Sequence, residues 1–205
     1  MPLIRKTPDA ASTGAGSDEN AAGLTSASAD VRWAAARDAA GHADAVPVLT
    51  AALARESDAR VREAIFTALA RIATPETVEA VLPYIRSDDA GLRTGALDAL
   101  RAMPELARPH LGELLADPDS DVRLLACDLA RTMSGPDAPK LLCTLIEGEP
   151  QANVCAAAVE VLAEIGDAGA VPSLARCAAR FPGDPFLAFA IQAASDQLRR
   201  QTGRV

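Results

Sequence analysis

A motif that recurs about every 30 residues constrains the fold of this chain more than any other feature. In each copy an apolar residue follows an acidic or small polar turn, and small or apolar residues recur up to eight positions later. This spacing places one apolar stripe along a helix. We call the first apolar residue of each copy its anchor. The six anchors, separated by 30, 31, 30, 32 and 32 residues, are Val31, Val61, Leu92, Val122, Val154 and Phe186.

Each copy except the sixth continues, after a break that contains Gly or Pro, into a second apolar run. Pro47 and Pro172 stand near the expected starts of second helices, where the missing N–H of proline costs little. One helix pair leaves an apolar face uncovered, and the next pair covers it. We therefore predict an all-α fold, an α-α superhelix of about six two-helix repeats whose last repeat acts as a cap. The second runs are 46–53, 78–85, 111–115, 141–146 and 171–178.

The composition limits which side chains can fill the core and which partners the chain can bind. Apolar residues make up 49% of the chain but aromatic residues only 3%, so the core must be built mainly from Ala, Leu, Val and Ile. Such small side chains suit stacked helix pairs. The net charge of −8 disfavours nucleic acid, which needs a basic face to displace counterions. No apolar run approaches the roughly 18 residues of a membrane span, and no secretory signal is visible. We therefore expect a cytoplasmic protein.

The beginning of the chain differs from the rest. Residues 1–27 are rich in Ala, Ser, Gly, Thr and Asp and show no sustained period. Such a segment buries too little apolar surface to offset its ordering entropy, so we predict a disordered N-terminal tail followed by a repeat domain over residues 28–205. Residues 1–6, in which Leu3 and Ile4 stand beside Arg5 and Lys6, are either an ordinary tail start or a short docking motif.

The recurring text resembles a known family. Residues 30–36 (DVRWAAA), 60–65 (RVREAI), 121–126 (DVRLLA) and 170–174 (AVPSL) look like the short HEAT-like repeats of phycobilisome lyases and bacterial scaffold proteins. The resemblance implies a right-handed superhelix whose second helices line a concave groove that binds other proteins. Members include bilin lyase subunits and adaptors, and the fold does not select among these activities.

An arginine follows the anchor in four copies, at Arg32, Arg62, Arg93 and Arg123, whereas the fifth copy has Cys155. One interpretation is an anion-binding stripe. The other is structural, with each guanidinium paired to a helix-capping acid of its own or the next repeat. Because the arginine recurs with the repeat itself, we favour the structural interpretation. The candidate acids are Asp30, Asp58, Asp89 and Asp121.

No set of residues indicates catalysis. The four cysteines form no C-x-x-C pair and sit in helical apolar patterns, which is typical of reduced core cysteines. His42 and His110 have no nucleophile signature near them, so we interpret both as surface residues. We therefore expect no catalytic residues, no metal site and no cofactor.

These observations lead to a protein-binding scaffold or regulatory adaptor that holds another protein in the concave groove. The alternative is a bilin lyase-type subunit that attaches a chromophore, and the sequence does not give the oligomeric state. An exposed Trp is a candidate partner anchor, and the other candidates are charged or aromatic residues of second helices. For each, an ordinary surface or end-capping role is the alternative. The predicted partner-binding residues are Trp33, Glu79, Tyr84, Arg86, Glu113, Lys140 and Arg176.

Overall fold

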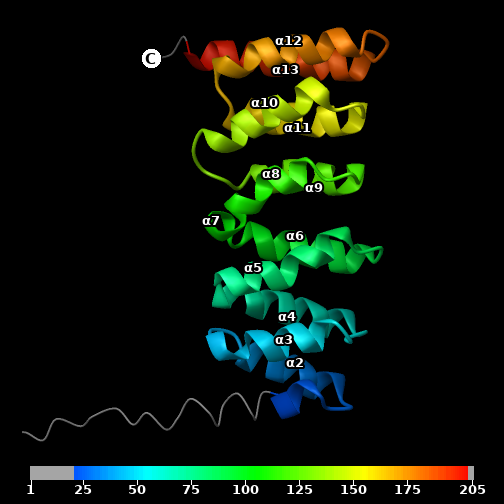
Figure 1. Cartoon of the computed structure of the whole chain (residues 1–205), viewed down its shortest axis with the longest axis vertical. Coiled ribbons are helices and arrows are strands. Elements are labelled where there is room, and N and C mark those ends of the chain that lie inside the picture. The colour runs from blue at the N-terminus through cyan, green and yellow to red at the C-terminus, as the bar shows by residue number, and fades with distance from the viewer. Residues whose placement is uncertain (1–20, 203–205) are drawn as a thin grey trace, which may run out of the picture. The chain divides into compact units, whose positions relative to one another are not determined.

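The structure is a computed structural model that describes residues 21–202, and in these residues every regular element is a helix (Figure 1). The all-α prediction is confirmed. The described chain divides into two compact units, the first ending at Ala102 and the second beginning at Met103. This boundary falls inside the third predicted repeat, whose first helix belongs to one unit and whose second helix belongs to the other.

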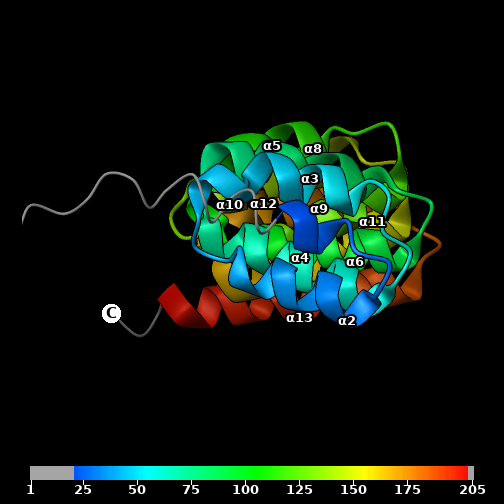
Figure 2. The same ribbon diagram turned by 90° about the horizontal axis from the view of Figure 1, so that it is seen from below.

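Among its described residues, the N-terminal unit contains two helix pairs and one further first helix, after a helical turn at residues 21–24. Within this unit α2, α4 and α6 form one layer and α3 and α5 form the other, as Figure 2 shows. Short 3₁₀ helices lead into or out of the second helices. The elements are α2 (Ala29–Asp38), η1 (Ala43–Ala45), α3 (Val46–Leu53), α4 (Ala59–Ile72), α5 (Pro75–Val81), η2 (Leu82–Arg86) and α6 (Ala90–Arg101).

The C-terminal unit begins with a second helix and ends with a first helix that has no successor among the described residues. Its first helices α9, α11 and α13 pack in sequence, as do its second helices α8, α10 and α12. The elements are α7 (Pro104–Ala107), η3 (Arg108–His110), α8 (Leu111–Leu115), α9 (Ser120–Ala130), α10 (Asp137–Gly148), α11 (Ala152–Ile165), η4 (Ala168–Ala170), α12 (Val171–Arg180) and α13 (Pro185–Thr202).

Local sequence explains where the helices start. The carboxylates of Asp58, Asp89 and Asp119 accept hydrogen bonds from backbone N–H groups in the first turns of α4, α6 and α9. These N-caps satisfy donors that have no partner within the helix. Pro47 and Pro172 stand in the first turns of α3 and α12, as predicted. All five predicted second runs are helical.

Packed structure begins before residue 28. Residues 1–20 of the predicted tail lie outside the described residues. Residues 21–24 are helical, and the side chain of Leu24 is only 2% exposed. Gly23 lies so close to α2 that an added Cβ would stand 2.6 Å from the Cβ of Ala35. A glycine therefore allows this turn to approach α2.

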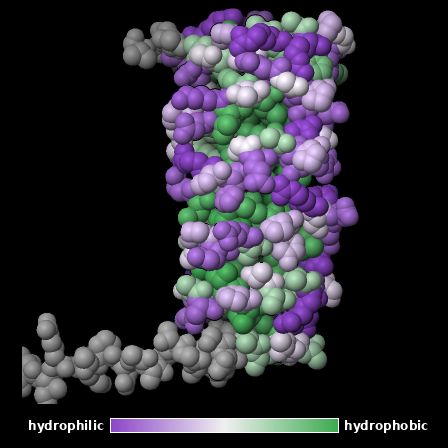
Figure 3. Space-filling model, viewed as in Figure 1, coloured by the Kyte–Doolittle hydropathy of each residue, from purple (hydrophilic) through white to green (hydrophobic). Residues whose placement is uncertain are grey.

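The core of each unit is made of aliphatic and small side chains, as the composition predicts. Fully buried residues include Leu49, Ile65 and Leu69 in the first unit and Leu142 and Leu162 in the second. On the face seen in Figure 3, hydrophobic residues of each unit show between rows of hydrophilic ones. All four cysteines are free; three are buried and Cys143 is half-buried.

The anchor of the sixth copy was assigned one residue too early. Phe186 is 87% exposed, whereas Leu187 is 2% exposed. The carboxylate of Asp184 accepts a hydrogen bond from the backbone N–H of Leu187, as that of Asp58 does from Val61. Because the N-cap sets which face of a helix is buried, Leu187 is the true anchor. Phe186 and Phe189 therefore lie on the exposed face of α13.

Candidate functional site

Consecutive first helices pack side by side within each unit, and we call each such contact a seam. The seams are α2/α4 and α4/α6 in the N-terminal unit, and α9/α11 and α11/α13 in the C-terminal unit. Two of these seams are closed by charged side chains and two are open grooves. The difference between them defines the candidate site.

Aromatic and charged side chains close one side of the α2/α4 seam. The guanidinium carbon of Arg37 lies 4.6 Å from the ring centroid of Trp33, and that of Arg60 lies 5.4 Å from it. These distances allow cation–π attraction. Arg60 on α4 also forms an ion pair with Asp30 on α2. Trp33 is thus half-buried under arginines rather than freely available.

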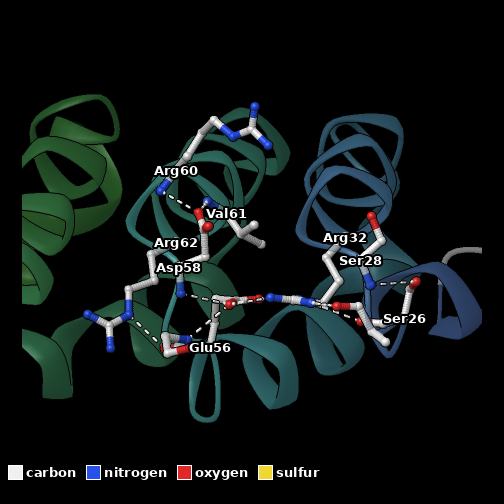
Figure 4. A network of polar contacts seen from close by, with 10 residues as sticks. Ser26, Ser28, Arg32, Glu56, Asp58, Arg60, Val61 and Arg62 are labelled. Carbon is white, nitrogen blue, oxygen red and sulfur yellow. Dashed lines mark hydrogen bonds and ion pairs between the residues drawn. The ribbon is translucent and has the colours of Figure 1, made fainter.

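A buried ion pair between Arg32 and Glu56 closes the other side of the same seam (Figure 4). Two guanidinium nitrogens of Arg32 donate to the carboxylate of Glu56, over 2.7 and 2.9 Å. The backbone N–H groups of Ser57 and Asp58 donate to the same carboxylate. The Arg32 hydrogen bond is the largest cause that lowers the pKa of Glu56 to about 2. We call this bidentate pair between consecutive repeats a staple.

The α9/α11 seam has the same design. Arg123 donates two hydrogen bonds to the buried carboxylate of Glu149, over 2.7 and 2.9 Å. Burial is the largest single cause and would raise the pKa of Glu149. The hydrogen bonds from Arg123 and from the backbone N–H of Gln151, together with the charges of Arg123 and Arg180, outweigh burial, and the pKa is lowered. Arg131, the C-cap residue of α9, also forms ion pairs with Glu160 and Glu164 of α11.

Arg32, Arg62 and Arg123 form ion pairs, as the structural interpretation expects, but two of the three acids differ from those predicted. Only Arg62 pairs with a predicted acid, Asp89, over 2.8 Å. The acids of the two staples, Glu56 and Glu149, were missed because they lie two residues before the N-cap position. Each arginine also donates to the backbone carbonyl six residues earlier, which ties it to its own turn. The acceptors for Arg32, Arg62, Arg93 and Arg123 are the carbonyls of Ser26, Glu56, Ser87 and Asp117.

The α4/α6 seam is a groove of about 900 Å³ with a floor of small residues and one phenyl ring. The ring belongs to Phe66, which is 4% exposed and covers Gly95 of α6. A Cβ at Gly95 would stand 2.4 Å from this ring, so only glycine allows the contact. Its charged lining residues are two bases and two acids: Arg62, Arg71, Glu63 and Asp98.

The α11/α13 seam is a groove of about 1020 Å³ whose aromatic rings point to solvent. Phe186 and Phe189 of α13 line it and are 87% and 75% exposed. Alanines of both helices form much of the rest of its surface. Its charged lining residues are three acids, Glu160, Glu164 and Asp184, and no Lys or Arg among residues 21–202 lines it.

None of the seven predicted partner-binding residues lines either groove. In the N-terminal unit, Tyr84 is half-buried and packs edge-to-face on Phe66, with ring centroids 5.8 Å apart. Burial raises the pKa of its hydroxyl. Glu79 and Arg86 are exposed on α5 and η2. Trp33 lies on a first helix, under Arg37 and Arg60.

The other three predicted residues lie on second helices of the C-terminal unit and are exposed. Glu113 is on α8. Lys140 on α10 lies 3.9 Å from the carboxylate of Asp137. Arg176 on α12 forms an ion pair with Glu147 of α10. The structure therefore divides the predicted set between two units, and their role in binding stays a prediction.

Sequence reasoning missed Phe189, although the signal was present. The position five residues after the N-cap holds Trp33 in α2 and Glu63 in α4. Trp33 is one of the predicted partner-binding residues, but its counterpart in α13 is not, because the predicted anchor of the sixth copy stands one residue too early. Counting from Asp184, the equivalent residue in α13 is Phe189. Unlike Trp33, its ring is 75% exposed, and no arginine of the part of the chain that the structure describes lies over it.

The described residues offer little for catalysis. Burial raises the pKa of Cys127 to about 12, and burial is also the largest cause that raises the pKa of Cys155 to about 12. Residues 21–202 hold no cluster of three or more His, Cys, Asp or Glu side chains arranged to bind a metal ion. No helix in this range combines the length and hydrophobicity of a membrane span.

Comparison with known proteins gives one family and several similar folds. A family model of HEAT repeats matches residues 17–101 and 108–202. No curated protein matches the chain significantly. A solved structure on microtubule plus-end tracking by XMAP215, CLIP-170 and EB1 is 16% identical, with a TM-score of 0.58, 88% of this chain and 90% of that chain covered.

Two further solved structures have lower TM-scores. An engineered protein is 22% identical, with a TM-score of 0.45, and 90% of this chain and 96% of that one are covered. The complex of CpcE and CpcF of phycocyanin lyase from Nostoc sp. PCC7120 is 16% identical, with a TM-score of 0.42, and 96% and 100% are covered. At these identities the likeness is one of fold.

Proposed function

Because the chain belongs to the HEAT repeat family, we propose that it is a protein-binding scaffold or regulatory adaptor, and that the α11/α13 groove holds its partner. One observation carries the proposal. Phe186 and Phe189 expose two large rings at the edge of an apolar groove. Exposed aromatic side chains beside a pocket are enriched among the residues that dominate binding energy.

The surroundings of the two rings support a binding role over a structural one. Leu187, Ile191, Ala194 and Leu198 already bury the inner face of α13. Phe186 and Phe189 are therefore not needed to hold the helix in place. Leaving two phenyl rings in water costs solubility, and contact with a partner would remove this cost.

The test compares the wild-type chain with the double variant Phe186→Ser/Phe189→Ser. Both are immobilised as full chains, and proteins captured from a native extract are identified. The matched control is Val31→Ser, which removes another exposed apolar side chain, 47% exposed, outside the groove. We expect at least one protein that the wild type and the control retain and the double variant loses. Identical captured sets for all three chains would refute the proposal.

Chromophore attachment remains the alternative from the sequence, and no residue described above favours it. The two buried thiols whose pKa is about 12 are protonated at neutral pH and are poor nucleophiles. We propose binding rather than catalysis. Titration of the chain with a bilin should leave the visible absorption spectrum of the bilin unchanged, and a shifted spectrum would restore the alternative.

A further inference from the structure

We infer that the α11/α13 groove binds an amphipathic α-helix of a partner protein, and that this helix carries Lys or Arg at both ends of its apolar stripe. The inference rests on the proposed function and goes further by naming the chemistry of the ligand. It follows from the groove's rings, its charges and the kind of backbone that the groove can accept.

The apolar part of the ligand follows from the lining. Phe186 and Phe189 stand three residues apart and so project from the same side of α13. Opposite them, α11 presents the half-buried Ala156 and Ala157 and leaves a hollow. Large rings on one wall and small side chains on the other are complementary to a row of bulky aliphatic side chains.

The charge of the ligand follows from the acids. Asp184 precedes the N-terminus of α13, whereas Glu160 and Glu164 lie in the second half of α11. The side chain of Gln197 donates to the carbonyl of Ala163 over 2.8 Å, which places the second halves of the two helices side by side. The acids therefore lie at both ends of the groove. Basic side chains on a ligand would complement both ends.

Arg131 marks one of these ends as a site for a cation. Its guanidinium already bridges Glu160 and Glu164 from α9, with an N–O distance of 3.2 Å to Glu160. Both glutamates nevertheless keep exposed side chains, 69% for Glu160 and 44% for Glu164. One arginine faces two carboxylates, so a negative charge remains for a basic residue of the ligand.

The helical form follows from the groove's backbone. The N–H and C=O groups along α11 and α13 are bonded within their own helices, so the groove has no strand edge with which an extended peptide could pair. A helix satisfies its own backbone and needs only side-chain contacts. The 14 residues of α11 span about 21 Å, which matches a ligand helix of about four turns.

The test uses two synthetic helical peptides of about 14 residues with the same row of leucines. One peptide carries Lys at both ends of the row, and its twin carries Glu at the same positions. Binding of each labelled peptide to the full chain is measured by fluorescence anisotropy at low and physiological salt. We expect the Lys peptide to bind at least about tenfold more tightly than the Glu peptide, and salt to reduce the difference.

Two variants locate the binding site. Phe186→Ser/Phe189→Ser should weaken binding of the Lys peptide at least about tenfold. Glu160→Gln/Glu164→Gln should weaken binding of the Lys peptide several-fold. Binding of the Glu peptide should stay unchanged or become tighter. Val31→Ser is the control and should bind both peptides as the wild type does. Circular dichroism of each variant checks that the chain remains folded.

The outcomes separate this inference from the proposed function. Suppose that neither peptide binds, or that both bind equally, while capture of proteins from the extract still requires the two phenylalanines. The inferred ligand chemistry is then wrong and the proposed function stands. If extract capture also ignores the phenylalanines, both fail. Sedimentation of the wild type as a dimer that Phe186→Ser/Phe189→Ser dissociates would assign the groove to a second copy and overturn the inference.

Discussion

The α4/α6 and α11/α13 grooves occupy equivalent places between consecutive first helices, yet they treat their phenyl rings in opposite ways. Phe66 stands eight residues after its N-cap and lies buried on Gly95. Phe186 and Phe189 stand two and five residues after Asp184 and are exposed. One repeat geometry therefore yields a groove with its ring buried in the floor or a groove with its rings exposed at the edge, according to the position of the ring relative to the cap.

The staples add a second difference. The closed seams α2/α4 and α9/α11 each have a buried bidentate Arg–Glu pair. The α4/α6 seam has a single contact to a half-exposed carboxylate, between Arg62 and Asp89. At the α11/α13 seam the residue after the anchor is Cys155 instead of arginine. Its thiol lies 3.6 Å from the backbone carbonyl oxygen of Glu149, in the turn before α11. The two large grooves between first helices lie at the seams that lack a staple, whereas the hollow beside the Arg123–Glu149 staple is smaller, about 490 Å³.

The largest expected effect separates the buried ring from the exposed ones. Phe66→Ala should lower the free energy of unfolding by about 3 kcal/mol, because it removes a buried ring and leaves a cavity on Gly95. Phe189→Ala should change it by less than about 0.5 kcal/mol. Urea denaturation of the full chain, followed by circular dichroism, measures both. Equal losses would erase the distinction between the two grooves.

A staple should matter more than the exposed pair at the α4/α6 groove. Glu56→Gln should cost about 2 kcal/mol, because it leaves Arg32 partly buried without its charged partner. Asp89→Asn keeps a capping side chain and breaks an exposed pair, so it should cost less than about 1 kcal/mol. Similar losses in urea denaturation would contradict the contrast between staple and groove.

The same staple predicts a pH dependence. The folded-state pKa of Glu56 is about 2, well below its ordinary value near 4.5. A lowered pKa stabilises the folded chain above the ordinary value, and this contribution is lost as pH falls from about 4.5 toward 2. Stability of the wild type should therefore fall across this window more steeply than stability of Glu56→Gln. Parallel curves would show that the carboxylate is not held by Arg32.

A smaller effect tests the floor of the α4/α6 groove. Gly95→Ala should cost about 1–2 kcal/mol, because the added Cβ would stand 2.4 Å from the Phe66 ring. Gly112→Ala is the matched control: its nearest neighbour would be a methyl group of Leu141 at 3.9 Å, and it should gain about 0.5 kcal/mol. A gain in thermal stability for Gly95→Ala would show that Phe66 does not need the glycine.

The smallest effect on stability concerns the rim of the α11/α13 groove. Arg131→Gln removes a surface network and should cost less than about 1 kcal/mol. The same change frees Glu160 and Glu164, so the basic peptide should bind a few-fold more tightly. Weaker peptide binding would indicate that Arg131 itself contacts the ligand.

The repeat pattern determined the helices because it is local. An anchor and the small or apolar residues three, four and eight positions later share one face of a helix whatever surrounds them, and an Asp before this face caps the first turn. The predicted second runs, the capping prolines and the buried Val61, Val122 and Val154 therefore agree with the structure. The family assignment follows from the same pattern.

Tertiary structure alone decided the partners of the arginines, whereas a local cap that the sequence already contains set the open face of α13. Glu56 and Arg32 lie 24 residues apart, and only the stacking of two repeats brings them together. Phe186 looked like an anchor because it follows an acidic turn. The hydrogen bond from Leu187 to Asp184 fixes the register one residue later. A shift of one residue turns a helix face by about 100°, which moves a ring from the core to solvent.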